Sequence, residues 1–198
     1  MNIENIVIEE EQKLSHEYKK IDDISFFNTK KVLDAFRENE ISTNMFDSTT
    51  GYGYNDLGRD TIEKVYKDIF KAEDALVRRE FISGTHALTV CLFALLRPND
   101  TLLSITGKPY DTLDEVIGIR DNKSSLKSYN INYEQIDLIN NEFDIEKIKN
   151  TLISKKIKVI EIQRSKGYST RKSITIKKLE EVIKEIRKVD KEVIIMID

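Results

Sequence analysis

Short apolar runs alternate with amphipathic stretches through the second half of this 198-residue chain. Runs of strand length occur at residues 101–106, 157–162 and 193–197, and a further strand is expected near 136–139. Helices are expected between them over 113–119, over 144–152 and in the segment that carries Ile176, Leu179, Val182, Ile183 and Ile186. Strands that alternate with helices predict a three-layer α/β fold, in which helices cover both faces of a mostly parallel sheet.

The first 80 residues are dominated by helical periodicity. Amphipathic helices are expected over 3–20 and 24–39, and short extended segments over 75–78 and 80–82. Residues 44–60 are rich in glycine, aromatic rings and hydroxyl groups, which is typical of a loop. Asp60 and Glu63 have the spacing of a capping box. This spacing predicts that the next helix begins at Asp60, with Arg59 directly before it.

The charge balance argues against a global attraction to nucleic acid or to an anionic membrane surface, because 35 acidic residues oppose 32 basic ones. No apolar run approaches the roughly 20 residues that a membrane-spanning helix requires. The acidic N-terminus is unlike a signal peptide. Cys91 is the one cysteine, so an internal disulfide is impossible, and it is expected as a buried hydrophobe in the apolar run 88–96. We expect a cytoplasmic protein without a metal site and without nucleic-acid or membrane partners.

The stretch Phe81-Ile-Ser-Gly-Thr-His-Ala-Leu88 predicts an anion site at the start of a buried helix. The first N–H groups of a helix have no partner within it, and the helix dipole attracts negative charge to that end. Gly84 lets the backbone approach an anion closely, and Ser83, Thr85 and His86 add side-chain donors. The alternative is an ordinary turn in which Ser83 serves as the helix N-cap.

Polar motifs follow several of the expected strands. They are Ser83–His86, Gly107–Tyr110, Arg164–Ser165 and Asp198. Loops after the carboxyl ends of parallel strands share one edge of the sheet, where open α/β folds bind ligands. A helix start for an anion, a ring for stacking, a cationic loop and a carboxylate would then meet in one cleft. This combination suits a flat, aromatic, phosphorylated cofactor with a cationic nitrogen.

Four stretches resemble one known family when they are taken together and in order. They are Gly51–Asp60, Phe81–Leu88, Gly107–Asp114 and Ile162–Tyr168. The chain resembles the fold-type-I pyridoxal-phosphate enzymes of cysteine and methionine metabolism, and within them the methionine γ-lyase-like branch known as aluminium-resistance proteins. The similarity runs from about residue 20 to the end.

The resemblance implies roles for residues along the expected sheet edge. Gly84 and Thr85 would bind the phosphate of pyridoxal 5'-phosphate. Tyr110 would stack on the pyridine ring, with His86 as a competing aromatic neighbour. Asp198 would pair with the pyridine nitrogen and keep it protonated, so that the ring can act as an electron sink. For Tyr110, the alternative is a core ring with a hydrogen-bonded hydroxyl.

Further residues are implied to contact the cofactor or the substrate. In the family, a loop with tyrosine and arginine reaches the phosphate in the neighbouring subunit. Tyr54 and Arg59 are the candidates here, although Tyr52 remains open and Arg59 could be a surface residue. Arg164 and Arg171 could bind a substrate carboxylate, since guanidinium matches it with paired hydrogen bonds. A solvated loop is the alternative for these two arginines.

The chain departs from the family pattern in one respect. The family's Schiff-base lysine lies downstream of the aspartate that matches Asp198, so it falls outside this sequence, and neither Lys108 nor Lys166 matches it. The resemblance implies a helical arm at residues 1–45 and the N-terminal part of the cofactor-binding large domain at 46–198, without the C-terminal domain.

Two functions are therefore expected. The first is a segment of a pyridoxal-phosphate-dependent carbon–sulfur lyase that acts on a sulfur-containing amino acid, and the second is a non-catalytic remnant or binding and oligomerisation module of the same fold. We expect no lyase activity from the chain alone. We also expect a homo-oligomer, because the apolar segment 193–197 would form an unpaired sheet edge.

Overall fold

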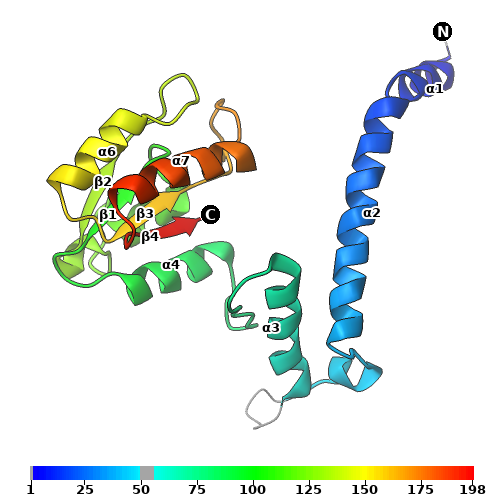
Figure 1. The fold of residues 1–198 in the computed structure, drawn as a ribbon, viewed down its shortest axis with the longest axis horizontal. Helices are drawn as coiled ribbons and strands as arrows, with labels where there is room; N and C mark the ends of the chain where they lie inside the picture. The colour runs from blue at the N-terminus through cyan, green and yellow to red at the C-terminus, as the bar shows by residue number, and fades with distance from the viewer. Residues whose placement is uncertain (1, 50–55) are drawn as a thin grey trace. The chain divides into compact units, whose positions relative to one another are not determined.

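The computed structural model describes residues 2–49 and 56–198. The chain divides into two compact units, residues 1–80 and 81–198. Each unit has its own secondary structure (Figure 1). Among the described residues, no helix combines the length and the apolar character needed to cross a bilayer.

The first unit is helical. It contains α1 (Ile3–Lys13), α2 (Ser15–Glu38), a 3-10 helix η1 (Thr43–Phe46) and α3 (Leu57–Phe70). The boundary between the first two helices falls at Leu14, whereas the sequence placed it between residues 20 and 24. Helices α2 and α3 contact each other; Ala35 and Val65 are buried, and Asn39 Nδ2 donates a 2.7 Å hydrogen bond to Asp68 Oδ2.

The start of α3 corrects the predicted capping box. Asp56 is the N-cap, because its Oδ1 accepts a 3.1 Å hydrogen bond from the backbone N–H of Arg59. Arg59 therefore lies within the first turn, and Glu63 instead accepts hydrogen bonds from the Val77 backbone and from Arg78. The predicted strands at 75–78 and 80–82 were wrong, since these residues are irregular.

The second unit is built around a four-stranded sheet. Its strands are β1 (Thr101–Ser104), β2 (Asn132–Gln135), β3 (Val159–Ile162) and β4 (Ile194–Ile197). All neighbours are parallel in the order β2-β1-β3-β4, so β4 is an edge strand as expected. Strand β2 lies four residues before the predicted segment 136–139; this prediction was wrong because β2 is a partly exposed edge strand with polar side chains.

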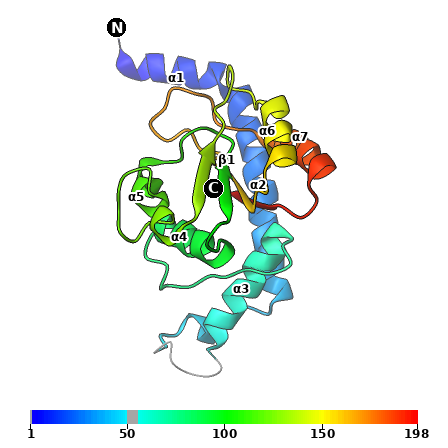
Figure 2. The same cartoon turned by 90° about the vertical axis from the view of Figure 1, so that its left-hand side faces the viewer.

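Helices cover both faces of this sheet, which confirms the predicted three-layer α/β fold. Figures 1 and 2 show α6 (Ile145–Ser154) and α7 (Ile176–Val189) on one face and α4 (Gly84–Leu95) and α5 (Asp114–Ile117) on the other. The α6–α7 face packs on Leu103, Ile105, Ile160 and Ile162. The opposite face packs on Leu102 and Val159. Burial of such side chains stabilises each face by about 1.5–3 kcal/mol per residue.

Helix α4 corrects another expectation. Its residues are apolar on nearly all sides, which predicted burial all round, yet Leu92 is the one residue of α4 that is buried. Cys91 is exposed, contrary to the expected buried position. Because α4 contacts the sheet along one side, an all-round apolar sequence leaves the rest of its surface uncovered in this chain.

Candidate functional site

The carboxyl ends of the parallel strands bring the predicted polar segments to one edge of the sheet. Hydrogen bonds connect them across the strands. The backbone N–H of Gln163, which follows β3, donates to Thr106 Oγ1 at 3.0 Å. Arg164 N–H donates to the Asp198 carbonyl at 2.8 Å, so the segments after β3 and β4 are also joined.

The N-terminus of α4 lies in this unit and has the features of an anion site. Ser83 is the N-cap, because its Oγ accepts a 3.1 Å hydrogen bond from His86 N–H. Gly84 is exposed, and a Cβ built on it would meet no atom within 4 Å. The Thr85 hydroxyl donates to Thr112 Oγ1 at 2.9 Å, which ties the helix start to the segment that follows β1. The capping alternative for Ser83 is thus confirmed, and it leaves open space beside Gly84.

His86 has a buried polar atom at this helix start. Its Nδ1 has no hydrogen-bond partner among the described residues. Its ring meets Phe81 edge-on, with the ring centroids 6.0 Å apart and an interplanar angle of 74°. A buried nitrogen without a partner is costly unless a ligand or water satisfies it.

Tyr110 is held from two sides by the segment after β3. Its backbone N–H donates to the side-chain oxygen of Gln163. Gly167 lies against the ring, since a Cβ there would be 2.9 Å from Tyr110 Cδ2. The Tyr168 ring lies 5.8 Å from the Tyr110 ring, and its hydroxyl raises the pKa of Tyr110. Tyr110 is half-buried, so it has a partly accessible ring and is not part of the core.

A pocket of about 510 Å³ opens beside this ring. Its lining includes Thr106, Tyr110, Gln163, Tyr168 and Arg171. Arg171 reaches it while its Nη2 donates to the carbonyls of Gln163, at 3.0 Å, and of Ser165. The pocket therefore combines aromatic rings with a cationic group at the predicted sheet edge.

Arg164 is exposed, and its Nε donates to the Ile174 carbonyl at 3.0 Å. Both predicted substrate arginines thus hold backbone carbonyls of the 163–174 loop. An arginine has five N–H donors, so these bonds leave donors for a second partner on each side chain. Asp198 is exposed, and its carbonyl accepts the hydrogen bond from the Arg164 backbone N–H in the same loop.

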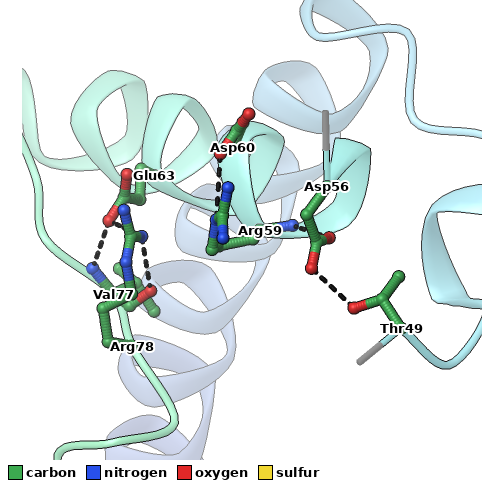
Figure 3. Close-up of polar contacts among 7 residues, drawn as sticks. All are labelled: Thr49, Asp56, Arg59, Asp60, Glu63, Val77 and Arg78. Carbon is green, nitrogen blue, oxygen red and sulfur yellow. Dashed lines mark hydrogen bonds and ion pairs between the residues drawn. The ribbon is translucent and has the colours of Figure 1, made fainter. Parts of the chain in front are cut away.

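Arg59 belongs to the first unit, and Figure 3 shows its surroundings. Its Nε donates to Asp60 at 3.1 Å, and Asp56 accepts from both Arg59 N–H and the Thr49 hydroxyl. A pocket of about 460 Å³ lies beside these residues and is also lined by Arg78. Tyr54 and Tyr52 lie outside the described residues.

Three residues at or beside the carboxyl ends of the strands were not predicted from the sequence. Thr112 joins α4 to the Tyr110 segment, and Gln163 joins Tyr110 to the loop after β3. Glu161 lies within β3 with 1% of its surface exposed. Burial raises the pKa of Glu161 to about 7, and the Asp198 charge adds to this effect. The sequence did carry a signal for Glu161, because a charged residue within an otherwise apolar strand indicates a buried carboxyl group.

A family model described as methionine gamma-lyase matches residues 3–198. The chain belongs to the methionine gamma-lyase family. The predicted resemblance is therefore confirmed.

Relatives within the methionine gamma-lyase family cover the same region. The uncharacterized protein YnbB of Bacillus subtilis (strain 168) is 42% identical over 199 residues, which are 99% of this chain and 47% of YnbB. A structure from Listeria innocua, named for a proposed cystathionine beta-lyase involved in aluminum resistance, is 46% identical with a TM-score of 0.95. The match covers 100% of this chain and 49% of the Listeria chain. The structure of a carbon-sulfur lyase involved in aluminum resistance from Clostridium novyi NT is 41% identical, with a TM-score of 0.89. The match covers 94% of this chain and 45% of the Clostridium novyi chain. The chain spans about half the length of these relatives.

Pyridoxal 5'-phosphate is the cofactor expected for the methionine gamma-lyase family. The described residues fit that group, because the open space at Gly84 lies at a helix start, the buried His86 Nδ1 needs a partner and an accessible tyrosine ring lies at the same sheet edge. Among the described residues, no cluster of three or more His, Cys, Asp or Glu side chains is placed to hold a metal ion.

Proposed function

We propose that this chain supplies the phosphate-, ring- and substrate-binding residues of a pyridoxal-phosphate-dependent carbon–sulfur lyase. The substrate proposed is a sulfur-containing amino acid. One observation carries the proposal: the helix start, where Gly84 is exposed and Thr85 half-buried, is tied through Thr112 to the segment that carries Tyr110. Membership of the methionine gamma-lyase family and the carbon-sulfur lyase from Clostridium novyi NT support the reaction class.

Each residue at the edge has a distinct role in the proposal. The backbone N–H groups of Gly84 and Thr85 bind the phosphate, and the helix dipole favours its negative charge. Tyr110 covers one face of the ring, and His86 lies at the same helix start with a nitrogen free to accept or donate a hydrogen bond. The Asp198 carboxylate binds the ring nitrogen. The cofactor, when bound, supplies an electron sink for negative charge on the substrate.

Arg171 and Arg164 are proposed to bind the substrate carboxylate. Arg171 is favoured because it lines the pocket beside Tyr110, and its bonds to backbone carbonyls hold the guanidinium in place. A planar guanidinium held in this way can bind a carboxylate with two parallel hydrogen bonds.

Tyr54 and Arg59 are proposed to bind the phosphate in a neighbouring copy, which makes the assembly a homo-oligomer. This role requires Arg59 to be held at the first turn of α3, and its N–H bond to Asp56 does so. We assign no Schiff-base lysine among these 198 residues. Lys108 is paired with Asp114 at 2.7 Å, and Lys166 lies in the exposed loop after β3.

The experiment is a calorimetric titration of the 198-residue chain with pyridoxal 5'-phosphate and, separately, with pyridoxal, which lacks the phosphate. We expect the phosphorylated compound to bind at least tenfold more tightly and inorganic phosphate to compete with it. In Gly84→Ala this preference is expected to disappear, because the new methyl group occupies the open space at the helix start. Equal binding of both compounds, or an unchanged preference in Gly84→Ala, would refute the proposed phosphate site.

A further inference from the structure

Ser104 at the end of β1 contacts two oxygen atoms at once. Its Oγ lies 2.7 Å from the carbonyl oxygen of Gly107 and 2.6 Å from Oε2 of Glu161. Ser104 and Glu161 are paired in register across β1 and β3, and both are buried. Gly107 has φ +85 and begins the turn that leads to Tyr110. The three groups therefore link the centre of the sheet to the turn below the candidate site.

The hydrogen count of this cluster determines the charge of Glu161. A hydroxyl has one hydrogen to donate, and a backbone carbonyl can only accept. If the Ser104 hydrogen lies on the contact with Gly107, the 2.6 Å contact with Glu161 needs a hydrogen from the carboxyl group. If Glu161 is ionised instead, the Ser104 hydrogen must point to it, and two oxygens without a hydrogen between them face each other at 2.7 Å. A neutral Glu161 satisfies both contacts.

The surroundings of Glu161 favour the neutral form as well. The second oxygen, Oε1, is buried and has no hydrogen-bond partner among the described residues. An ionised carboxylate in such a place would carry a large desolvation cost. Burial has the largest effect and raises the pKa of Glu161, and the like charge of Asp198, beyond the end of β4, raises it further. A hydrogen donated by Ser104 and the charge of Arg171, in the loop after β3, both act to lower it. Tyr133 on β2 is a further titratable neighbour, and burial and then the Glu161 charge raise its pKa.

We propose that Glu161 is a neutral carboxylic acid that donates its hydrogen to Ser104, and that it is a positioning residue for the turn from Gly107 to Tyr110. The hydrogen bonds from Glu161 to Ser104 and from Ser104 to the Gly107 carbonyl hold this turn against the buried part of the sheet. While Glu161 carries its proton, it adds no negative charge beside Asp198. That Asp198 binds a cationic ring nitrogen rests on the proposed function, whereas the position of the Glu161 proton does not.

The position of the proton is tested on the 198-residue chain without any cofactor. Carboxyl ¹³C labelling of glutamate allows each side chain to be titrated by NMR, and Glu161→Gln identifies the Glu161 signal by its loss. We expect a midpoint at about pH 7, against the ordinary value of 4.5. Glu192→Gln is the matched control, because Glu192 is exposed and its variant should leave the Glu161 signal in place. A Glu161 midpoint below pH 5 would overturn the proposal.

Ser104→Ala distinguishes the two directions of the hydrogen bond. If Glu161 donates to Ser104, removal of the hydroxyl destabilises the neutral acid and lowers the midpoint. If Ser104 donates to an ionised Glu161, the same variant raises the midpoint, and this result contradicts the proposal. In Glu161→Gln the amide can still donate to Ser104, so the Tyr110 ring signals should match those of the unmodified chain at pH 6 and stay unchanged at pH 8.5. Should this variant shift the Tyr110 signals at pH 6, Glu161 does not position the turn as a neutral donor.

Failure of this inference is distinguishable from failure of the proposed function. The titrations of Glu161 contain no cofactor, and the test of the phosphate site depends on Gly84. A normal Glu161 midpoint together with a phosphate preference leaves the proposed function standing, and the reverse result leaves the neutral acid standing.

Discussion

The Thr85 hydroxyl donates a 2.9 Å hydrogen bond to Thr112 Oγ1 and thereby joins two segments that are 27 residues apart in the chain. Thr85 lies in the first turn of α4, and Thr112 lies in the 3-10 helix η2 (Asp111–Leu113) that follows Tyr110. This bond sets the helix start proposed to bind phosphate against the segment that carries Tyr110, the ring proposed to stack on the cofactor. Both elements belong to the 81–198 unit.

Replacement of Thr112 by valine is expected to weaken binding of pyridoxal 5'-phosphate by about fivefold, because a net hydrogen bond contributes about 1 kcal/mol and Thr85 loses its orientation. Calorimetric titration measures the change. Thr151→Val on α6 is the control, since it also removes a threonine hydroxyl that bonds within the chain, to the carbonyl of Lys147. Equal losses of affinity in both variants would show that the bond to Thr112 has no specific role.

Gly167→Ala is expected to destabilise the 81–198 unit by about 1–2 kcal/mol, because Gly167 has φ +54 and alanine is strained there. The new Cβ would also lie 2.9 Å from Tyr110 Cδ2 and push the ring away. Urea denaturation and the Tyr110 NMR signals report the two effects. Gly84→Ala is the matched control: Gly84 has open space around it, so the same change should keep or raise stability.

The sequence predicted the strands with apolar side chains, β1, β3 and β4, and misplaced the strand with polar side chains, β2. β1 and β3 lie in the interior of the sheet, so their residues form continuous apolar runs. β2 is an edge strand of the sequence Asn-Tyr-Glu-Gln, and its polar composition is that of a loop. The buried Ile136 directly after it moved the predicted strand four residues along the chain.

The position of candidate site residues could be predicted where a loop follows an apolar strand, as for Tyr110 and Arg164. The connections between such loops could not, because they depend on contacts between distant segments. Gln163 is an example: its side chain accepts from the backbone of Tyr110, 53 residues away. The prediction of where α3 begins was wrong for a local reason. Asp56 and Asp60 are both suitable N-caps, and the sequence alone favoured Asp60.

Asp56→Ala is expected to lower the melting temperature of the helical unit, residues 1–80, by roughly 4–8 °C, because it removes the cap of α3 and such a cap contributes about 1 kcal/mol. Asp60→Ala is the matched control, because this exposed aspartate was the predicted cap but accepts a hydrogen bond from the Arg59 side chain instead of a backbone N–H of α3. Circular dichroism during heating measures both variants. A larger decrease in melting temperature for Asp60→Ala than for Asp56→Ala would show that Asp60 is the N-cap of α3.

The stability of the chain is expected to fall between about pH 4.5 and pH 7 through Glu161. Its pKa is raised from 4.5 to about 7 in the folded chain, so the folded state binds more protons than the unfolded state in this window. Stability contributed by the neutral acid is fully present below pH 4.5 and is lost as the pH rises through 7. The loss is at most about 3–4 kcal/mol, at 1.36 kcal/mol for each pKa unit.

Urea denaturation at pH 5 and pH 8 measures this loss, and Glu161→Gln removes its cause because glutamine does not ionise. We expect the variant to change little relative to the unmodified chain at pH 5 and to be more stable than it at pH 8. The difference between the two pH values cancels any general effect of the substitution on packing, which would act equally at both. Equal stability differences at pH 5 and pH 8 would mean that Glu161 has the same charge in the folded and unfolded chain, and therefore that burial beside Ser104 and Asp198 does not retain its proton.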